Sequence, residues 1–247
     1  MSKRNVNKTA ERAARAAALK AEQERKEKRR RLLLIGGVVA ALVFVVAAGF
    51  LVQNLRNTTG EAATPPAGVV DDYGVVVGDH AAPTTVTIYE DFQCPVCAEF
   101  EKEIGEELNA GIEAGTVKVD YRMVSFLDRA SGNEYSSRAL NAAAVVLDIA
   151  GVDAFKAFHD DLFANQPDEG TDGPEDDELI AAAAAAGADE SEVRSAIENK
   201  VFAQWIENAT EQMSVDEVNG TPTVFIDGEL AGSTPQEYAD AIRAGLG

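Results

Sequence analysis

The stretch YEDFQCPVCAEF, residues 89–100, decides the fold because it joins a predicted strand to a predicted helix and holds both cysteines of the chain. The overlapping segment TTVTIYEDF, residues 84–92, is rich in β-branched and aromatic residues, which is typical of a buried strand. Pro95 then marks a helix start, because proline is favoured at the first helical position. Apolar residues recur every four positions after it, which predicts an amphipathic helix with acidic side chains such as Glu101 facing water. The apolar stripe consists of Val96, Phe100, Ile104, Leu108 and Ile112.

The two cysteines differ in their predicted surroundings. Cys94 lies beside unpaired backbone N–H groups at the positive end of the helix dipole. This position stabilises a thiolate and lowers the pKa below the free value of about 8.5. Cys97 lies one turn further along, closer to the core, and keeps its proton longer. The pair therefore supplies one exposed nucleophile and one resolving thiol, which together perform thiol–disulfide exchange.

Two other interpretations of the pair are weaker. A structural disulfide across so short a loop stabilises a fold by only about 2 kcal/mol, against about 3 kcal/mol for a loop of about fifteen residues. A structural zinc ion needs four ligands, and the only two histidines, His80 and His159, stand alone at unrelated positions. We therefore expect a redox couple with no metal, and no cofactor beyond the redox-active Cys94–Cys97 disulfide.

The remaining pattern places this junction in one domain, residues 69–247. The predicted order of elements is a strand, a helix, a strand, a helical block, two strands and a final helix. TVKVDYRMVSF, residues 116–126, predicts the second strong strand. The helical block runs from about 128 to 213, and its last part, residues 189–213, is predicted to be one long helix. Pro222 directly precedes an apolar strand. Because proline cannot donate to a sheet ladder, this position suggests a turn, an edge or a cis bond.

Three stretches together resemble the DsbA-like thiol–disulfide oxidoreductases of the thioredoxin superfamily: YEDFQCPVC, VDAFKAFHDDLFANQ and VNGTPTVFIDGELAGSTPQEYADAI. The resemblance implies an α/β thioredoxin-like fold interrupted by the helical insertion. It also implies that Pro222 is cis and stacks against the cysteine pair, while Pro95 and Val96 complete the active-site motif. Thr221 would then offer its backbone to an extended substrate peptide, a form of strand addition.

The chain departs from this family at one position. Members often carry a buried acid six residues before the first cysteine, where it can accept protons during exchange, but Ile88 stands there in this sequence. Glu90 lies on the same strand face and is a candidate proton relay. The sequence favours the alternative, a solvated or partner-facing carboxylate. For Asp91 we expect a role in the turn.

The N-terminal part predicts a membrane anchor. Residues 1–31 carry 12 Lys and Arg against 4 Asp and Glu, whereas the whole chain has a net charge of −20. Residues 32–52 contain no charge, and a helix of this length spans about 31 Å, the thickness of a bilayer core. We expect a cytoplasmic basic tail, a single transmembrane helix and a flexible linker, residues 53–68, with the domain outside the cell membrane. A cleaved signal peptide is the alternative for the apolar segment.

These features predict an extracytoplasmic enzyme that oxidises thiols of exported proteins and is reoxidised by a membrane redox partner. The strong acidity of the outer part argues against nucleic acid as a partner. Two alternatives remain open from the sequence. The same pair can serve a disulfide reductase or isomerase, including one for cytochrome maturation, or the domain can bind peptides beside Pro222 without turnover.

Overall fold

The computed structural model describes residues 62–246, which contain a six-stranded sheet with helices on both faces. The strands lie in the order β1-β2-β4-β3-β5-β6. Their bounds are β1 Val69–Val70, β2 Gly74–Val77, β3 Thr84–Glu90, β4 Val117–Met123, β5 Thr223–Ile226 and β6 Glu229–Leu230. Strands β3 and β4 are parallel, and every other pair in the sheet is antiparallel. The predicted tail and transmembrane segment, and the predicted linker up to residue 61, lie outside the described residues.

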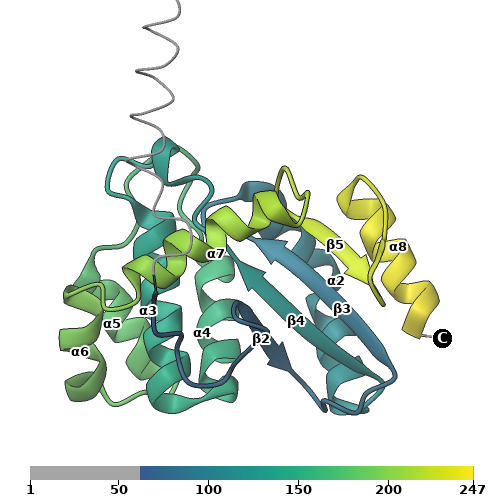
Figure 1. Cartoon of the computed structure of the whole chain (residues 1–247), viewed down its shortest axis with the longest axis horizontal. Coiled ribbons are helices and arrows are strands. Elements are labelled where there is room, and N and C mark those ends of the chain that lie inside the picture. The colour runs from purple at the N-terminus through teal and green to yellow at the C-terminus, as the bar shows by residue number, and fades with distance from the viewer. Residues whose placement is uncertain (1–61, 247) are drawn as a thin grey trace, which may run out of the picture. The chain divides into compact units, whose positions relative to one another are not determined.

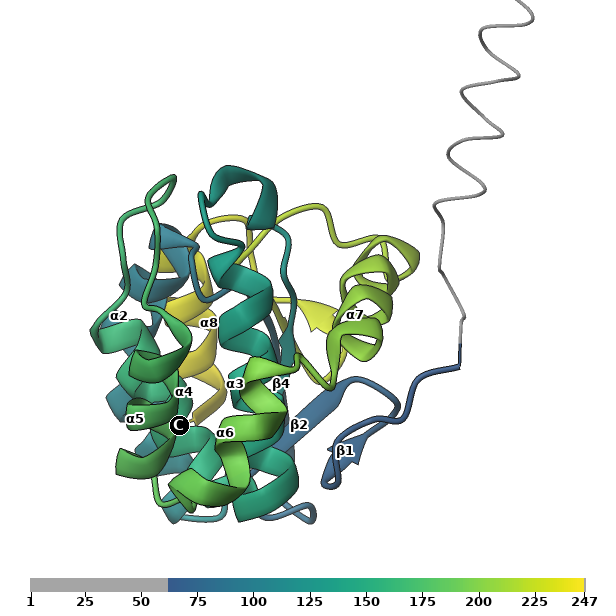
Figure 2. The ribbon, with the colours of Figure 1, turned by 90° about the vertical axis from the view of Figure 1, so that its left-hand side faces the viewer.

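The helices fall into two groups on the chain. Helix α2, Pro95–Glu113, connects β3 to β4, and α8, Pro235–Leu246, closes the chain and packs against α2. The helical block between β4 and β5 contains η1 Asp128–Ala130, α3 Tyr135–Ala150, α4 Val152–Ala164, α5 Asp176–Ala185, α6 Glu190–Glu198 and α7 Ala203–Val215. Figure 1 shows β4 beside β3 in the middle of the sheet and α8 beyond β5. Figure 2 shows α7 on the opposite face of the sheet from α2, α4 and α8. This arrangement confirms a thioredoxin-like α/β fold with a helical insertion.

The predicted long helix over residues 189–213 is wrong, because the chain breaks between α6 and α7. Lys200 has a φ of 49°, which no helix continues through. The buried side chain of Asn141 in α3 holds the break from both sides: its Nδ2 donates to the Ile197 carbonyl at 3.2 Å, and its Oδ1 accepts from the Phe202 N–H at 3.1 Å. These bonds satisfy backbone groups that the interruption frees.

The apolar stripe of α2 also differs from its prediction at the first turn. Val96 is 40% exposed, whereas Cys97 is fully buried and begins the stripe that continues through Phe100, Ile104 and Leu108. A strict repeat of four residues drifts around a helix of 3.6 residues per turn, so it leaves the core-facing side at one end. Within the described residues, no helix combines the length and the apolar character that crossing a membrane requires.

Candidate active site

The turn between β3 and α2 is fixed by Asp91. Its carboxylate accepts hydrogen bonds from the Gln93 N–H at 2.8 Å, the Leu127 N–H at 2.8 Å and the Ser136 hydroxyl at 2.6 Å. Asp91 is fully buried, and burial raises its pKa to about 6 although these bonds oppose the rise. The residue therefore does more than shape the turn, since it also ties the start of α2 to η1 and α3.

Cys94 is the N-cap residue of α2, and Pro95 follows at the first helical position. The Cys94 Sγ lies 3.3 Å from the carbonyl oxygen of Thr221, and the peptide bond from Thr221 to Pro222 is cis. The structure thus brings the two sequence-predicted segments, 127 residues apart, into contact. Pro222 is buried.

Cys94 is less open than the sequence led us to expect. Only 5% of its surface is exposed, and Cys97 has none. The expectation of an exposed nucleophile is wrong in this respect, and the carbonyl oxygen of Thr221 lies against the sulfur. Gln166 binds the same turn from a third segment, since its Nε2 donates to the carbonyl oxygens of Cys94 at 2.9 Å and Phe92 at 3.1 Å. Gln166 was not singled out from the sequence, although it ends one of the family-like stretches.

The two thiols have opposite pKa shifts. The pKa of Cys94 is lowered from 9.0 to about 7, chiefly by the hydrogen bond from the Cys97 thiol, with further help from the Thr221 side chain and the backbone N–H groups of Cys97 and Val96. Burial opposes this lowering. The pKa of Cys97 is raised well above 9.0 by burial, by its bond to Cys94 and by repulsion from Glu90. The helix start therefore contributes to thiolate formation, but the neighbouring thiol contributes more.

Glu90 is fully buried, so the favoured prediction of a solvated or partner-facing carboxylate is wrong. Its Oε2 lies 3.1 Å from Nε2 of His159, which is also fully buried, in α4. On the other side of the ring, His159 Nδ1 lies 3.1 Å from Oδ1 of Asp160. Burial by itself would lower the pKa of His159, but the hydrogen bonds to Asp160 and Glu90 raise it to about 9. The contacts with the two acidic side chains therefore favour the protonated imidazole.

Glu101, which was expected to face water, lies one helical turn after Cys97 in α2, and its Oε1 is buried. Burial, and then repulsion from Glu90, raises the pKa of Glu101 to about 8. Ligand atoms of Glu90, Glu101 and His159 lie within 4.8 Å of one another, so these three residues could hold a metal ion. The expectation that the chain holds no metal stays a prediction.

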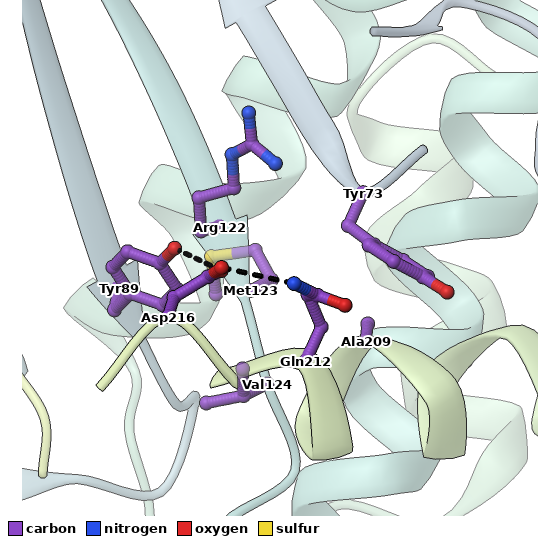
Figure 3. Close-up of a pocket in the computed structure, with 8 residues that line it drawn as sticks. All are labelled: Tyr73, Tyr89, Arg122, Met123, Val124, Ala209, Gln212 and Asp216. Atoms are coloured by element: carbon purple, nitrogen blue, oxygen red, sulfur yellow. Dashed lines mark hydrogen bonds between the residues drawn. The ribbon is translucent and has the colours of Figure 1, made fainter. Parts of the chain in front are cut away.

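Two hollows flank this region. A groove of about 600 Å³ between α2 and α4 is lined by residues that include Glu101, Lys102, Asp160 and Phe163. The other hollow, between the sheet and α7, has a volume of only about 10 Å³, room for one water molecule at most. Figure 3 shows that Asp216 is held there by the hydroxyl of Tyr89 and the amide of Gln212. Neither cysteine lines the small hollow, so we assign it no role in the thiol chemistry.

The site is a buried pair of thiols at a strand–helix junction, facing a loop with a cis-proline. One thiol has a lowered pKa and the other a raised pKa. Together these features define a thiol–disulfide oxidoreductase. The chain belongs to the thioredoxin family, because the model of the family described as Thioredoxin matches residues 71–244. Its architecture is of the DsbA type.

Solved structures support this placement. The reduced disulfide bond oxidoreductase DsbG of Mycobacterium tuberculosis is 35% identical, with a TM-score of 0.60, over 70% of this chain and 88% of that chain. DsbA of the same organism is 34% identical, with a TM-score of 0.60, over 71% of this chain and 93% of that chain. BdbD of Bacillus subtilis shares the fold, with 23% identity and a TM-score of 0.62, over 75% of this chain and 95% of that chain.

Among curated proteins, the serine/threonine-protein kinase PknE of Mycobacterium tuberculosis is 29% identical over 164 residues, or 64% of this chain. The match covers 29% of the kinase. The likeness therefore concerns one segment of that protein.

Proposed function

We propose that this chain is an extracytoplasmic oxidoreductase that forms disulfide bonds in exported proteins through the Cys94–Cys97 pair. The observation that carries the proposal is the contrast between the two thiols. The pKa of Cys94 is lowered to about 7, while that of Cys97 is raised well above 9.0. A thiol with a low pKa is a good leaving group, so a mixed disulfide through Cys94 is released quickly to the substrate.

The reaction begins with the pair oxidised. A substrate thiolate attacks Cys94 Sγ, the bond between the two cysteine sulfurs breaks, and Cys97 leaves as a thiolate that takes up a proton. A second substrate thiolate then attacks the substrate sulfur of the mixed disulfide and expels the Cys94 thiolate. The substrate loses two electrons and gains a disulfide, and the pair gains those two electrons. The pair itself is the redox group, so no further cofactor or metal enters these steps.

The substrate segment is proposed to lie along the loop before β5. The carbonyl oxygen of Thr221, which precedes the cis Pro222, lies 3.3 Å from Cys94 Sγ, and an extended peptide can add to the backbone there as an extra strand. Val96 is 40% exposed beside the nucleophile and offers an apolar contact. Because Val96 carries no charge, we also propose a milder oxidant than a relative with histidine at this position.

The cellular setting rests on the sequence. We propose a cytoplasmic tail, residues 1–31, a transmembrane anchor, residues 32–52, a linker, residues 53–68, and a catalytic domain, residues 69–247, outside the cell membrane. The basic tail and the uncharged 21-residue segment support this order. A membrane redox partner is proposed to reoxidise the pair after each cycle.

The test uses a reduced, unfolded secreted protein with two cysteines as the substrate. The oxidised full chain should form the substrate disulfide, Cys97→Ala should accumulate a mixed disulfide with a small disulfide reagent, and Cys94→Ala should do neither. If Cys94→Ala retains full oxidising activity, the enzyme proposal fails. If the parent binds the peptide and never exchanges disulfides, the domain is a peptide-binding module. A parent that only reduces or reshuffles disulfides in a glutathione buffer is a reductase or isomerase.

A further inference from the structure

A cluster of polar side chains lies in the core between β3, α2 and α4, apart from the thiol pair. One ligand atom from each of Glu90, Glu101 and His159 lies within 4.8 Å of the other two. Glu90 and His159 are fully buried, and Glu101 is partly buried. Two carboxylates and an imidazole therefore meet at one place, although Glu90 and His159 are 69 residues apart in the sequence.

Three polar atoms in this region have no hydrogen-bond partner within residues 62–246. They are Oε1 of Glu90, Oε1 of Glu101 and the hydroxyl oxygen of Tyr121, and all three are buried. Tyr121 is fully buried, and its ring centroid lies 4.4 Å from that of His159. An unpaired buried polar atom is costly, because it has lost its bonds to water without a replacement. Three such atoms around one imidazole point to a ligand that several of them bind together.

The imidazole is oriented as it is in metal sites. Its Nε2 lies 3.1 Å from Glu90 Oε2, and its Nδ1 lies 3.1 Å from Asp160 Oδ1 on the other side of the ring. Lys156 holds the Asp160 carboxylate with a bond of 2.6 Å. A histidine that binds a metal through one ring nitrogen almost always donates its other N–H to a carboxylate, a carbonyl or water. Asp160 therefore occupies the position of such a partner, and Nε2 is left for the metal.

We propose that Glu90, Glu101 and His159 bind one Zn²⁺ ion between β3, α2 and α4. Imidazole and carboxylate ligands suit zinc, and three protein ligands with one water complete its tetrahedral shell. The two carboxylates balance the charge of the ion. Binding forms bonds from zinc to Nε2 and to the two carboxylates, and it releases the proton that Nε2 shares with Glu90 to water.

The spacing of the ligands requires only a small adjustment. Ligands bound tetrahedrally at about 2.0–2.1 Å lie roughly 3.4 Å from one another. The separations in the structure are at most 4.8 Å, and the side chain of Glu101 is only partly buried, so it has room to rotate. Glu101 also lines the groove of about 600 Å³ between α2 and α4. This groove gives the ion, and the water that completes its shell, a route to the site.

The site goes beyond the proposed function, because the zinc ion takes no part in disulfide exchange. One bound ion would join the end of β3, the helix that carries the cysteines and a helix of the insertion, so its effect is on stability. The expectation of no metal rested on the cysteines having no partner ligands. The proposed site uses carboxylates instead and leaves both cysteines free.

The test uses the oxidised full chain, because its closed disulfide offers no thiolate to zinc. The protein is treated with a chelator, dialysed and equilibrated with Zn²⁺ alone, and bound zinc and the melting temperature are measured. Glu101→Gln removes one ligand. Its matched control is Glu106→Gln, since Glu106 is exposed on the same helix and lines the same groove. Asp160→Asn is the second test variant, and Asp161→Asn is its control at an exposed neighbouring position.

We expect the parent to bind one zinc ion and to melt at a higher temperature with zinc than without it. Asp160→Asn should weaken zinc binding by about 10–100-fold, the usual effect of losing such a partner, and Glu101→Gln should weaken it at least about tenfold. Both controls should match the parent. The site is refuted if the parent binds no zinc, or if Glu101→Gln binds zinc as tightly as Glu106→Gln does. If Glu101→Gln fails to fold, equal affinities of Asp160→Asn and Asp161→Asn refute the site.

Discussion

The stability of the reduced protein should rise with pH relative to that of the oxidised protein. The cause is the pKa of Cys94, which is 9.0 as an ordinary thiol and about 7 in the fold. A group whose folded pKa is depressed contributes stability above its unfolded pKa, and this stability is lost as the pH falls through the folded pKa. The reduced form should therefore gain stability between about pH 7 and pH 9. The oxidised form has no free thiol and should not share this gain.

The magnitude follows from the two pKa values. One pKa unit corresponds to about 1.4 kcal/mol, so the fold favours the Cys94 thiolate by roughly 3 kcal/mol in total. Of this, about 2 kcal/mol should develop between pH 6 and pH 9. His159 has the opposite sign: its raised pKa stabilises the fold below about 6.5, and this stability is lost as the pH rises through about 9. Cys94→Ala keeps His159, so comparison with this variant separates the contribution of Cys94 from that of His159.

The assay is urea denaturation of the reduced and oxidised full chain across this pH range. The quantity of interest is the free energy of unfolding of the reduced form minus that of the oxidised form. Cys94→Ala, compared with the reduced parent, is the control that should lose the pH-dependent gain. A difference that stays flat from pH 6 to pH 9 would refute the reasoning, because no thiolate would then be favoured by the fold.

Three further predictions concern single side chains. Cys97→Ala removes the strongest influence lowering the pKa of Cys94, so ultraviolet titration should place that pKa at least about one unit higher; an unchanged value contradicts this. Asp91→Ala leaves two N–H groups and the Ser136 hydroxyl unpaired, so the free energy of unfolding should fall by about 3 kcal/mol or more; denaturation showing under about 1 kcal/mol argues otherwise. Val96→His should raise the reduction potential in glutathione equilibration, and a lower potential would count against it.

Local sequence signals predicted the part of the site that depends on neighbouring residues. The strand before Cys94 and the helix after Pro95 follow from residue type and spacing, and both lie where the pattern placed them. The greater depth of Cys97 follows from its position one turn inside the helix. These inferences need no knowledge of the rest of the chain.

The remaining features depend on contacts that no local pattern encodes. Glu90 is buried because His159, 69 residues later, supplies a charged partner in the core. Glu101 occupies a helix face that a polar residue normally turns to water, yet α4 packs over it. Asn141 interrupts a pattern that would otherwise continue as one helix. In each case a segment distant in the sequence sets the surroundings of a polar side chain, which periodicity cannot reveal.

The most direct test of the account is titration of the Cys94 thiol in the reduced full chain, followed by ultraviolet absorbance of the thiolate and checked by the rate of alkylation at each pH. We predict ionisation near pH 7, with Cys97 still protonated above pH 9. If Cys94 ionises at or above pH 9.0, as an ordinary thiol does, the fold does not lower the pKa of Cys94 relative to that of Cys97. The proposed chemistry is then contradicted.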